Sequence, residues 1–149
     1  MLIDFDDFKP INDTLGHRVG DEVLRAISAR MRAALSPNDF LARIGGDELL
    51  LVHSNADAQC RSEVESVASR MLAAIAQSVV VDEHAIAIRA SMGIAMFPEH
   101  GRDTNVLREC ADRALYRAKS DGGNRAIVYV RGDHGIDRTS GNHRALPTE

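Results

Sequence analysis

Two groups of carboxylates near the start of the chain are placed where they could share a divalent cation. The segment Gly45–Glu48 lies between two apolar, strand-like runs, so we expect a hairpin with its glycines at positive φ and its two acids opening the second strand. The segment Asp4–Asp7 follows the apolar run Met1–Ile3, and ligand sites tend to form at the carboxyl ends of strands in open α/β sheets. Magnesium binds a few carboxylate oxygens together with water and phosphate, so Asp4 and Asp47 are the candidate ligands.

The same acids have a simpler explanation. An Asp that follows a strand often hydrogen-bonds its own backbone, and acidic pairs are commonly solvated. On spacing alone, metal binding and turn formation are equally good explanations of Asp4 and Asp47.

Stretches with apolar residues at helical spacing alternate with strand-like runs along the chain. The helical stretches run from Asp21 to Leu35 and over residues 64–75 and 107–115, and the strands cover residues 1–4, 39–44, 48–53, 85–97 and 125–130. The order β-α-β-β-α-β-α-β predicts an α+β fold, in which helices pack on the faces of one mainly antiparallel sheet.

The composition is that of an ordinary single domain. The 149 residues are 44% hydrophobic and 27% charged, and no apolar run approaches the roughly 20 residues that a membrane helix requires. The formal net charge of −4 argues against nucleic-acid binding, which depends on clustered Lys and Arg. We therefore expect any bound nucleotide to be small and metal-chelated.

The cysteines and the C-terminal segment offer no further site. Cys60 and Cys110 lack the spacing of a zinc site or a disulfide framework, so we interpret them as plain thiols. No secretory signal precedes the first strand, which makes a reducing cytoplasm the expected location. Residues 131–149 contain almost no large apolar side chains, so we expect a disordered polar tail after a domain formed by residues 1–130.

Several segments, in order along residues 1–130, resemble one known family. They are residues 4–13, residues 43–49 with the sequence Arg-Ile-Gly-Gly-Asp-Glu-Leu, residues 91–101, and residues 111–125. Together they are similar to the GGDEF domains, which are diguanylate cyclases. The resemblance implies a palm-like fold of the nucleotide cyclase and ferredoxin-like type, which agrees with the order of elements above.

The resemblance also implies a metal-dependent reaction. In the family, the positions of Asp4 and Asp47 and the carbonyl of Phe5 bind metal, which would be two Mg²⁺ or Mn²⁺ ions per GTP. The same likeness makes Asp47 the proton acceptor for the attacking 3′-hydroxyl, with Glu48 assisting.

Asn12 and Asp21 match the family's contacts to guanine. A carboxylate accepts hydrogen bonds from the N1 and N2 hydrogens of guanine, which adenine cannot offer, so GTP would be favoured over ATP. The structural alternatives are an N-cap role for Asp21 on the helix that runs to Leu35, and a helix-end or turn role for Asn12 near Gly16.

The resemblance places two lysines and a helix start on the triphosphate. Lys9, restrained by the proline that follows it, would stabilise charge in the transition state, and Lys119 would bind phosphate as a point charge. The backbone amides of Asp7 and Phe8 would lie nearby. Ordinary solvated lysines are the alternative, with Lys119 a favourable cation at a helix C-terminus.

The sequence departs from the family at four places. Leu49 replaces the usual Phe in a core-facing position, at little expected cost. Gly123 stands where the family usually has a phosphate-binding Arg. This difference should weaken GTP binding by about 1.5–3 kcal/mol unless Arg125 compensates. The Arg-x-x-Asp site of product inhibition reads Ser36–Asp39, so we predict no feedback inhibition there. The family's N-terminal helix is absent, and we expect marginal stability from the exposed apolar area, at roughly 25 cal/mol per Å².

Three hypotheses follow for the function. The first is a diguanylate cyclase in which two GTP-loaded copies form a homodimer. The second is a GTP-binding module that regulates a sensory domain or an EAL phosphodiesterase domain in a longer parent, because Phe8–Asp13 and Phe97–Gly101 are similar to members that precede such a domain. The third, a palm-like nuclease or polymerase, is disfavoured by the acidic charge balance.

Overall fold

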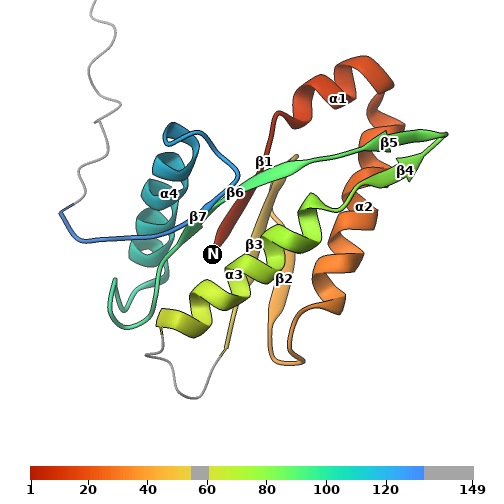
Figure 1. Ribbon diagram of the computed structural model, residues 1–149. Helices are drawn as coiled ribbons and strands as arrows, with labels where there is room; N and C mark the ends of the chain where they lie inside the picture. Colours follow the sequence, from red (N-terminus) through yellow and green to blue (C-terminus); the bar gives the residue numbers. More distant parts are fainter. Residues whose placement is uncertain (55–60, 133–149) are drawn as a thin grey trace, which may run out of the picture.

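The computed structural model describes residues 1–54 and 61–132, and these form an α+β fold built on one central sheet (Figure 1). The elements are β1 (Leu2–Asp6), α1 (Phe8–Leu15), α2 (His17–Ala33), β2 (Phe40–Arg43), β3 (Glu48–Val52), α3 (Arg61–Ala76), β4 (Val79–Val81), β5 (His84–Ile86), β6 (Arg89–Ile94), α4 (Thr104–Ser120) and β7 (Ala126–Val128).

The main sheet has the strand order β2-β3-β1-β6-β7. Its pairs are antiparallel except for the parallel pair of β6 and β7. The predicted fold class, a mainly antiparallel sheet with helices on its faces, is therefore confirmed. β1 lies at the centre of the sheet, so the end of this strand is the natural place for a site that gathers residues from several elements.

Alternation along β1 decides which helices cover which face. Ile3 and Phe5 are buried against α2 and α3, in a core that these helices share with β3 and β6. Leu2 points to the opposite face, where it packs with Ala111 and Leu115 of α4. Figure 1 shows α4 alone on that side of the sheet. Asp4 and Asp6, two and four residues after Leu2, share the α4 face because side chains alternate along a strand.

The helices at the start of the chain differ from those predicted. The prediction began a helix near Asp21, whereas α2 begins at His17, and α1 was not predicted as a helix at all. Pro10 lies in the first turn of α1, where its missing N–H costs nothing. Gly16, at φ 84°, separates the two helices and is the N-cap of α2. The alternative N-cap role for Asp21 is therefore wrong, because Asp21 lies inside α2.

The long strand predicted over residues 85–97 is divided, and a further strand precedes it. β4 and β5 form a separate antiparallel hairpin, and β6 is the part that joins the main sheet. The turn of this hairpin places Asp82 and Glu83 at positive φ, 46° and 68°. β4 escaped prediction because Val79–Val81 is a short apolar run that follows a helix directly, and such a run has no alternation to identify it.

Some expectations fall outside the described residues. These are the expectations for Cys60 and for residues 133–149 of the predicted tail. Cys110, by contrast, is buried in α4, and its thiol donates to the carbonyl of His100 at 3.6 Å. In the described part of the chain, each helix is too short or too polar to cross a bilayer.

Candidate active site

The two acidic groups meet at the end of the central strand. In the register of β1 and β3, Asp4 stands opposite Glu48. The next residue, Phe5, donates its backbone N–H to the carbonyl of Asp47 at 3.3 Å. Residues directly opposite on antiparallel strands have side chains on the same face, so the carboxylates of Asp4 and Glu48 share the α4 face. The sequence prediction that these segments are neighbours is confirmed in this respect.

The Gly-Gly-Asp-Glu turn has a different backbone from the one predicted. Neither Gly45 nor Gly46 has a positive φ, and Asp47 belongs to the turn, since β3 begins at Glu48. Gly45 is needed for space, because a Cβ atom on it would lie 2.8 Å from Glu48 Oε2. Arg43 stabilises the turn, as its Nε donates to the carbonyls of Gly45 and Gly46 at 3.1 and 2.9 Å.

Asp4 is the most enclosed acid of the site. Its side chain is 13% exposed, and Oδ1 lies 2.5 Å from Nζ of Lys119 in the last turn of α4. Burial raises the pKa of Asp4 above its ordinary value; Lys119 opposes the rise through its hydrogen bond and charge, while the nearby charges of Asp47 and Asp6 add to it. The structure thus brings a carboxylate that needs a counter-ion together with a lysine that supplies one.

The residues at this end of β1 suit a divalent cation that also binds phosphate. No cluster of three or more His, Cys, Asp and Glu side chains arranged for a metal occurs in residues 1–54 and 61–132. Mg²⁺, however, commonly takes only one or two carboxylates and completes its coordination with water and substrate phosphates. Asp4, partnered by a cation and influenced by the charge of Asp47, provides that kind of donor set. These residues therefore fit a divalent cation that takes most of its ligands from water or phosphate.

Asn12 and Asp21 approach one another where α1 and α2 pack. A Cβ atom on Gly20 would lie 2.0 Å from Asn12 Oδ1, so the amide of Asn12 rests directly on Gly20, next to Asp21. Asp21 is half exposed and lies 3.8 Å from Nη1 of Arg43. Arg43 therefore connects the predicted guanine contacts to the Gly-Gly-Asp-Glu turn.

The start of α1 places its residues at the same end of β1. Asp7 is the N-cap residue and adopts the left-handed conformation, with φ 55°, and its carboxylate lies 3.6 Å from Nη2 of Arg89. Phe8 is buried in the core, and Lys9, in the first helical turn, is exposed. A helix N-terminus directs backbone N–H groups and a positive dipole end outward, which suits an anion.

Asp6 anchors the turn that follows α4. Its Oδ1 accepts from the buried hydroxyl of Ser91 at 2.7 Å, and its Oδ2 accepts from the backbone N–H of Asn124 at 2.8 Å. Gly123, the position at which the resemblance leads us to expect Arg, has φ 70°, and a Cβ atom there would lie 2.9 Å from Asp6 Oδ2. Arg125 donates from Nε to the carbonyl of Gly123 at 3.1 Å, so its guanidinium is folded back on the turn.

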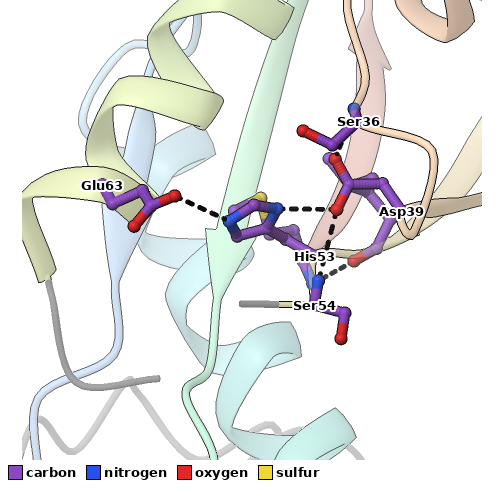
Figure 2. A network of polar contacts seen from close by, with 7 residues as sticks. Ser36, Asp39, His53, Ser54 and Glu63 are labelled. Atoms are coloured by element: carbon purple, nitrogen blue, oxygen red, sulfur yellow. Dashed lines mark hydrogen bonds and ion pairs between the residues drawn. The ribbon is translucent and has the colours of Figure 1, made fainter. Parts of the chain in front are cut away.

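Asp39, the remaining acid of the Ser36–Asp39 segment, is held inside the protein (Figure 2). Its side chain is fully buried and accepts from His53 Nδ1 at 2.7 Å and from the backbone N–H groups of Ser36 and Ser54 at 2.9 and 3.2 Å. Burial acts to raise the pKa of Asp39, but these hydrogen bonds and the charge of His53 outweigh it and hold the pKa below its ordinary value. On its other side, His53 Nε2 lies 3.7 Å from Glu63 Oε1.

A cavity of about 340 Å³ opens beside the site, between the first half of α4 and the β2–β3 turn. Its polar lining includes Glu48 from β3 and Arg108, Glu109 and Asp112 from α4. Asp4 and Lys119 do not line it, so this cavity adjoins the acidic cluster without containing it.

Two residues of this site received no role from the sequence. Asp6 could have been found from alternation, because it lies two residues after Asp4 on the same face of β1. Arg43 could not, because its importance comes from the turn carbonyls and from Asp21, a residue of a different element. Leu49 is buried, as its core-facing prediction required.

Comparison with known proteins identifies the family. The sequence model of the family described as "Diguanylate cyclase, GGDEF domain" matches residues 1–125. The chain is 37% identical over 130 residues to the cyclic di-GMP phosphodiesterase PdeR of Escherichia coli, covering 87% of this chain and 19% of that protein. It is 38% identical over 131 residues to the diguanylate cyclase DosC of Escherichia coli, covering 87% of this chain and 28% of that one. The chain thus spans less than a third of the length of either relative.

Solved structures show the same fold. An EAL/GGDEF domain protein from M. capsulatus superimposes with a TM-score of 0.77 at 40% identity, covering 87% of this chain and 82% of that one. The GGDEF domain of TpbB from Pseudomonas aeruginosa superimposes with a TM-score of 0.80 at 34% identity, covering 87% and 80%.

Proposed function

Because this chain belongs to the GGDEF domain family of diguanylate cyclases, we propose that it condenses two molecules of GTP into cyclic di-GMP and two pyrophosphates. Each copy of a homodimer would hold one GTP, and the 3′-hydroxyl of each nucleotide would attack the α-phosphate of the other. One copy alone cannot complete the reaction, because each site supplies half of the ring.

The observation that carries this proposal is the gathering of unlike charges at the end of β1. The Asp4 carboxylate, the amine of Lys119 and the turn containing Asp47 lie together there, although they come from distant parts of the chain. Phosphoryl transfer requires mainly positioning and stabilisation of negative charge, and this arrangement supplies groups for both.

Each group of residues has a task in the reaction. Asp4, Asp47 and the carbonyl of Phe5 would hold the divalent ions. When bound, those ions would neutralise phosphate charge and ease deprotonation of the attacking hydroxyl. Asp47 would accept that proton, assisted by Glu48.

The remaining groups would select and orient the nucleotide. At the guanine edge, the Asp21 carboxylate would accept hydrogen bonds and the Asn12 amide could donate or accept. Arg43 would keep Asp21 facing the turn. Lys9, Lys119 and the amides of Asp7 and Phe8 would bind the triphosphate, the last two through the helix N-terminus.

A second function is favoured by specific observations. Gly123 lacks the usual phosphate-binding side chain, and Arg125 directs its Nε to the carbonyl of Gly123 within its own turn. One relative is named a cyclic di-GMP phosphodiesterase and one structural neighbour is an EAL/GGDEF protein. The alternative is therefore a GTP-binding domain of low activity that regulates a partner or an EAL domain in a longer protein.

Incubation with GTP and Mg²⁺ or Mn²⁺, followed by mass spectrometry of the products, separates these functions. Cyclic di-GMP supports the cyclase, whereas GTP binding without product supports the regulatory domain. Asp47→Ala should abolish product formation. Glu65→Ala, which removes an exposed acid of α3 that pairs with Arg61, is the control and should leave it unchanged. Equal turnover by Asp47→Ala and the wild type would refute the assignment of Asp47.

A further inference from the structure

Lys119 and Asp4 form an ion pair at the position where the proposed function requires a metal ion. The Lys119 amine lies 2.5 Å from Asp4 Oδ1. The carboxylate is nearly enclosed, at 13% exposure, while the lysine side chain is 43% exposed. An enclosed carboxylate requires a counter-charge, and Lys119 supplies it.

The rest of the acidic cluster explains why the lysine pairs with Asp4. Both oxygens of Asp6 are engaged, one by Ser91 and the other by the backbone of Asn124. Asp47 adds a further negative charge near Asp4. Asp4 is therefore the acid of this cluster that attracts a cation, and any other cation bound there must compete with Lys119.

The backbone that carries Lys119 is held firmly, but its side chain has room to move. α4 packs so closely on β6 that a Cβ atom on Gly93 would lie 2.0 Å from the carbonyl oxygen of Ala111. Beyond the helix, the turn is fixed by the bond between Asp6 and Asn124. The lysine amine is a compact charge on a flexible stem of four carbons, so it can leave Asp4 without any movement of the helix.

We propose that Lys119 is an exchangeable internal cation: it occupies Asp4 in the nucleotide-free protein and moves to the triphosphate when GTP binds, which leaves Asp4 to the metal. This inference rests on the proposed function, because it assigns Asp4 to metal and Lys119 to phosphate. Its consequence is that metal and nucleotide bind with positive coupling, and the coupling must be reciprocal. The nucleotide-free protein would bind a divalent cation weakly, because a metal and an ammonium group on one carboxylate repel each other.

The test measures Mn²⁺ binding to the nucleotide-free protein, by electron paramagnetic resonance of unbound Mn²⁺. Removing the internal cation with Lys119→Met should strengthen Mn²⁺ binding at least about tenfold, which corresponds to about 1.4 kcal/mol. Lys119→Gln, which keeps a polar side chain at the surface, should do the same. Arg113→Gln is the matched control, because it removes one positive charge from the same helix at a residue that pairs with Glu109, and it should leave the affinity unchanged.

A second substitution assigns the gain to Asp4. Adding Asp4→Asn to Lys119→Met should remove the increase in Mn²⁺ affinity. The α,β-methylene analogue of GTP, which cannot undergo transfer, should raise the Mn²⁺ affinity of the wild type more than that of Lys119→Met.

Equal Mn²⁺ affinity of the wild type, Lys119→Met and Lys119→Gln would overturn the exchange. So would an equal gain in Arg113→Gln, which would show an effect of net charge alone. Formation of cyclic di-GMP by the wild type tests the proposed function separately, so a protein that makes product without this response to Lys119→Met would contradict the exchange only.

Discussion

Substitution of Gly93 by Ala should damage the protein through the contact between α4 and the sheet. A Cβ atom at residue 93 would lie 2.0 Å from the carbonyl oxygen of Ala111 and 2.3 Å from the backbone N of Leu115. Ordinary contacts of a Cβ atom begin at 3.4 Å, so α4 would have to retreat by 1.4 Å (3.4 minus 2.0). Both clashing atoms belong to the helix backbone, and a change of rotamer cannot relieve them. We therefore expect Gly93→Ala to lower the free energy of unfolding by about 3 kcal/mol, which is near the upper end of the range for overpacked cores.

Urea denaturation followed by far-UV circular dichroism measures this loss, and the melting temperature should fall by roughly 10 °C. Gly46→Ala is the control, because no atom lies within 4 Å of its added Cβ and its φ is not positive. Its free energy of unfolding should stay within about 0.5 kcal/mol of the wild type. If Gly93→Ala were as stable as Gly46→Ala, the close packing of α4 on β6 would be wrong, and with it the fixed position of Lys119.

Three further predictions concern other contacts. Asp39→Asn should lower the free energy of unfolding at pH 7 by about 1.5–3 kcal/mol. The pKa of Asp39 is depressed in the folded state, so its contribution is present above the unfolded pKa of 3.8 and is lost as the pH falls through the folded pKa. The variant and the wild type should then converge in urea titrations below pH 3.8, and a constant difference would contradict this. Gly20→Ala should push the Asn12 amide aside and raise the KM for GTP about threefold to tenfold; an unchanged KM would argue against Asn12 as a guanine contact. In a chain that begins at Met1, burial lowers the pKa of the terminal amine from 8.0 to about 6, so stability should rise by about 2–3 kcal/mol as the pH increases through that interval. N-terminal acetylation should abolish the rise.

The strands of the central sheet were predictable because their apolar runs are bounded by polar or glycine-containing segments. α1 was not predictable, because Asn12 and Asp13, which lie inside this helix, and Gly16, which ends it, are typical turn residues. The packing of Phe8 into the core, which favours the helix, is a tertiary contact. The glycine conformations of the Gly-Gly-Asp-Glu turn were predicted wrongly. Hairpin rules assume a turn that is determined locally, whereas this turn is held by the guanidinium of Arg43.

The candidate site, too, could be predicted only in part from the sequence. Asp4, Asp47 and Lys119 were identified by type and motif, but their contacts depend on tertiary structure. The pairing of Lys119 with Asp4 joins residues from α4 and β1, and no local pattern contains it. The anchoring of Asn124 by Asp6 spans 118 residues of sequence. Local rules therefore identify groups with the right chemistry, while the tertiary fold decides which residue each group pairs with.

The central position of β1 has a consequence for synthesis of the chain on the ribosome. This strand emerges before β3 and β6, the two neighbours with which it pairs. Until residues 48–52 and 89–94 have been translated, the nascent strand has no partner, and its apolar side chains are open to chaperones or to aggregation. The candidate site at the end of β1 would then be among the last parts of a newly made molecule to form, and a truncated translation product that ends before β6 would lack it altogether.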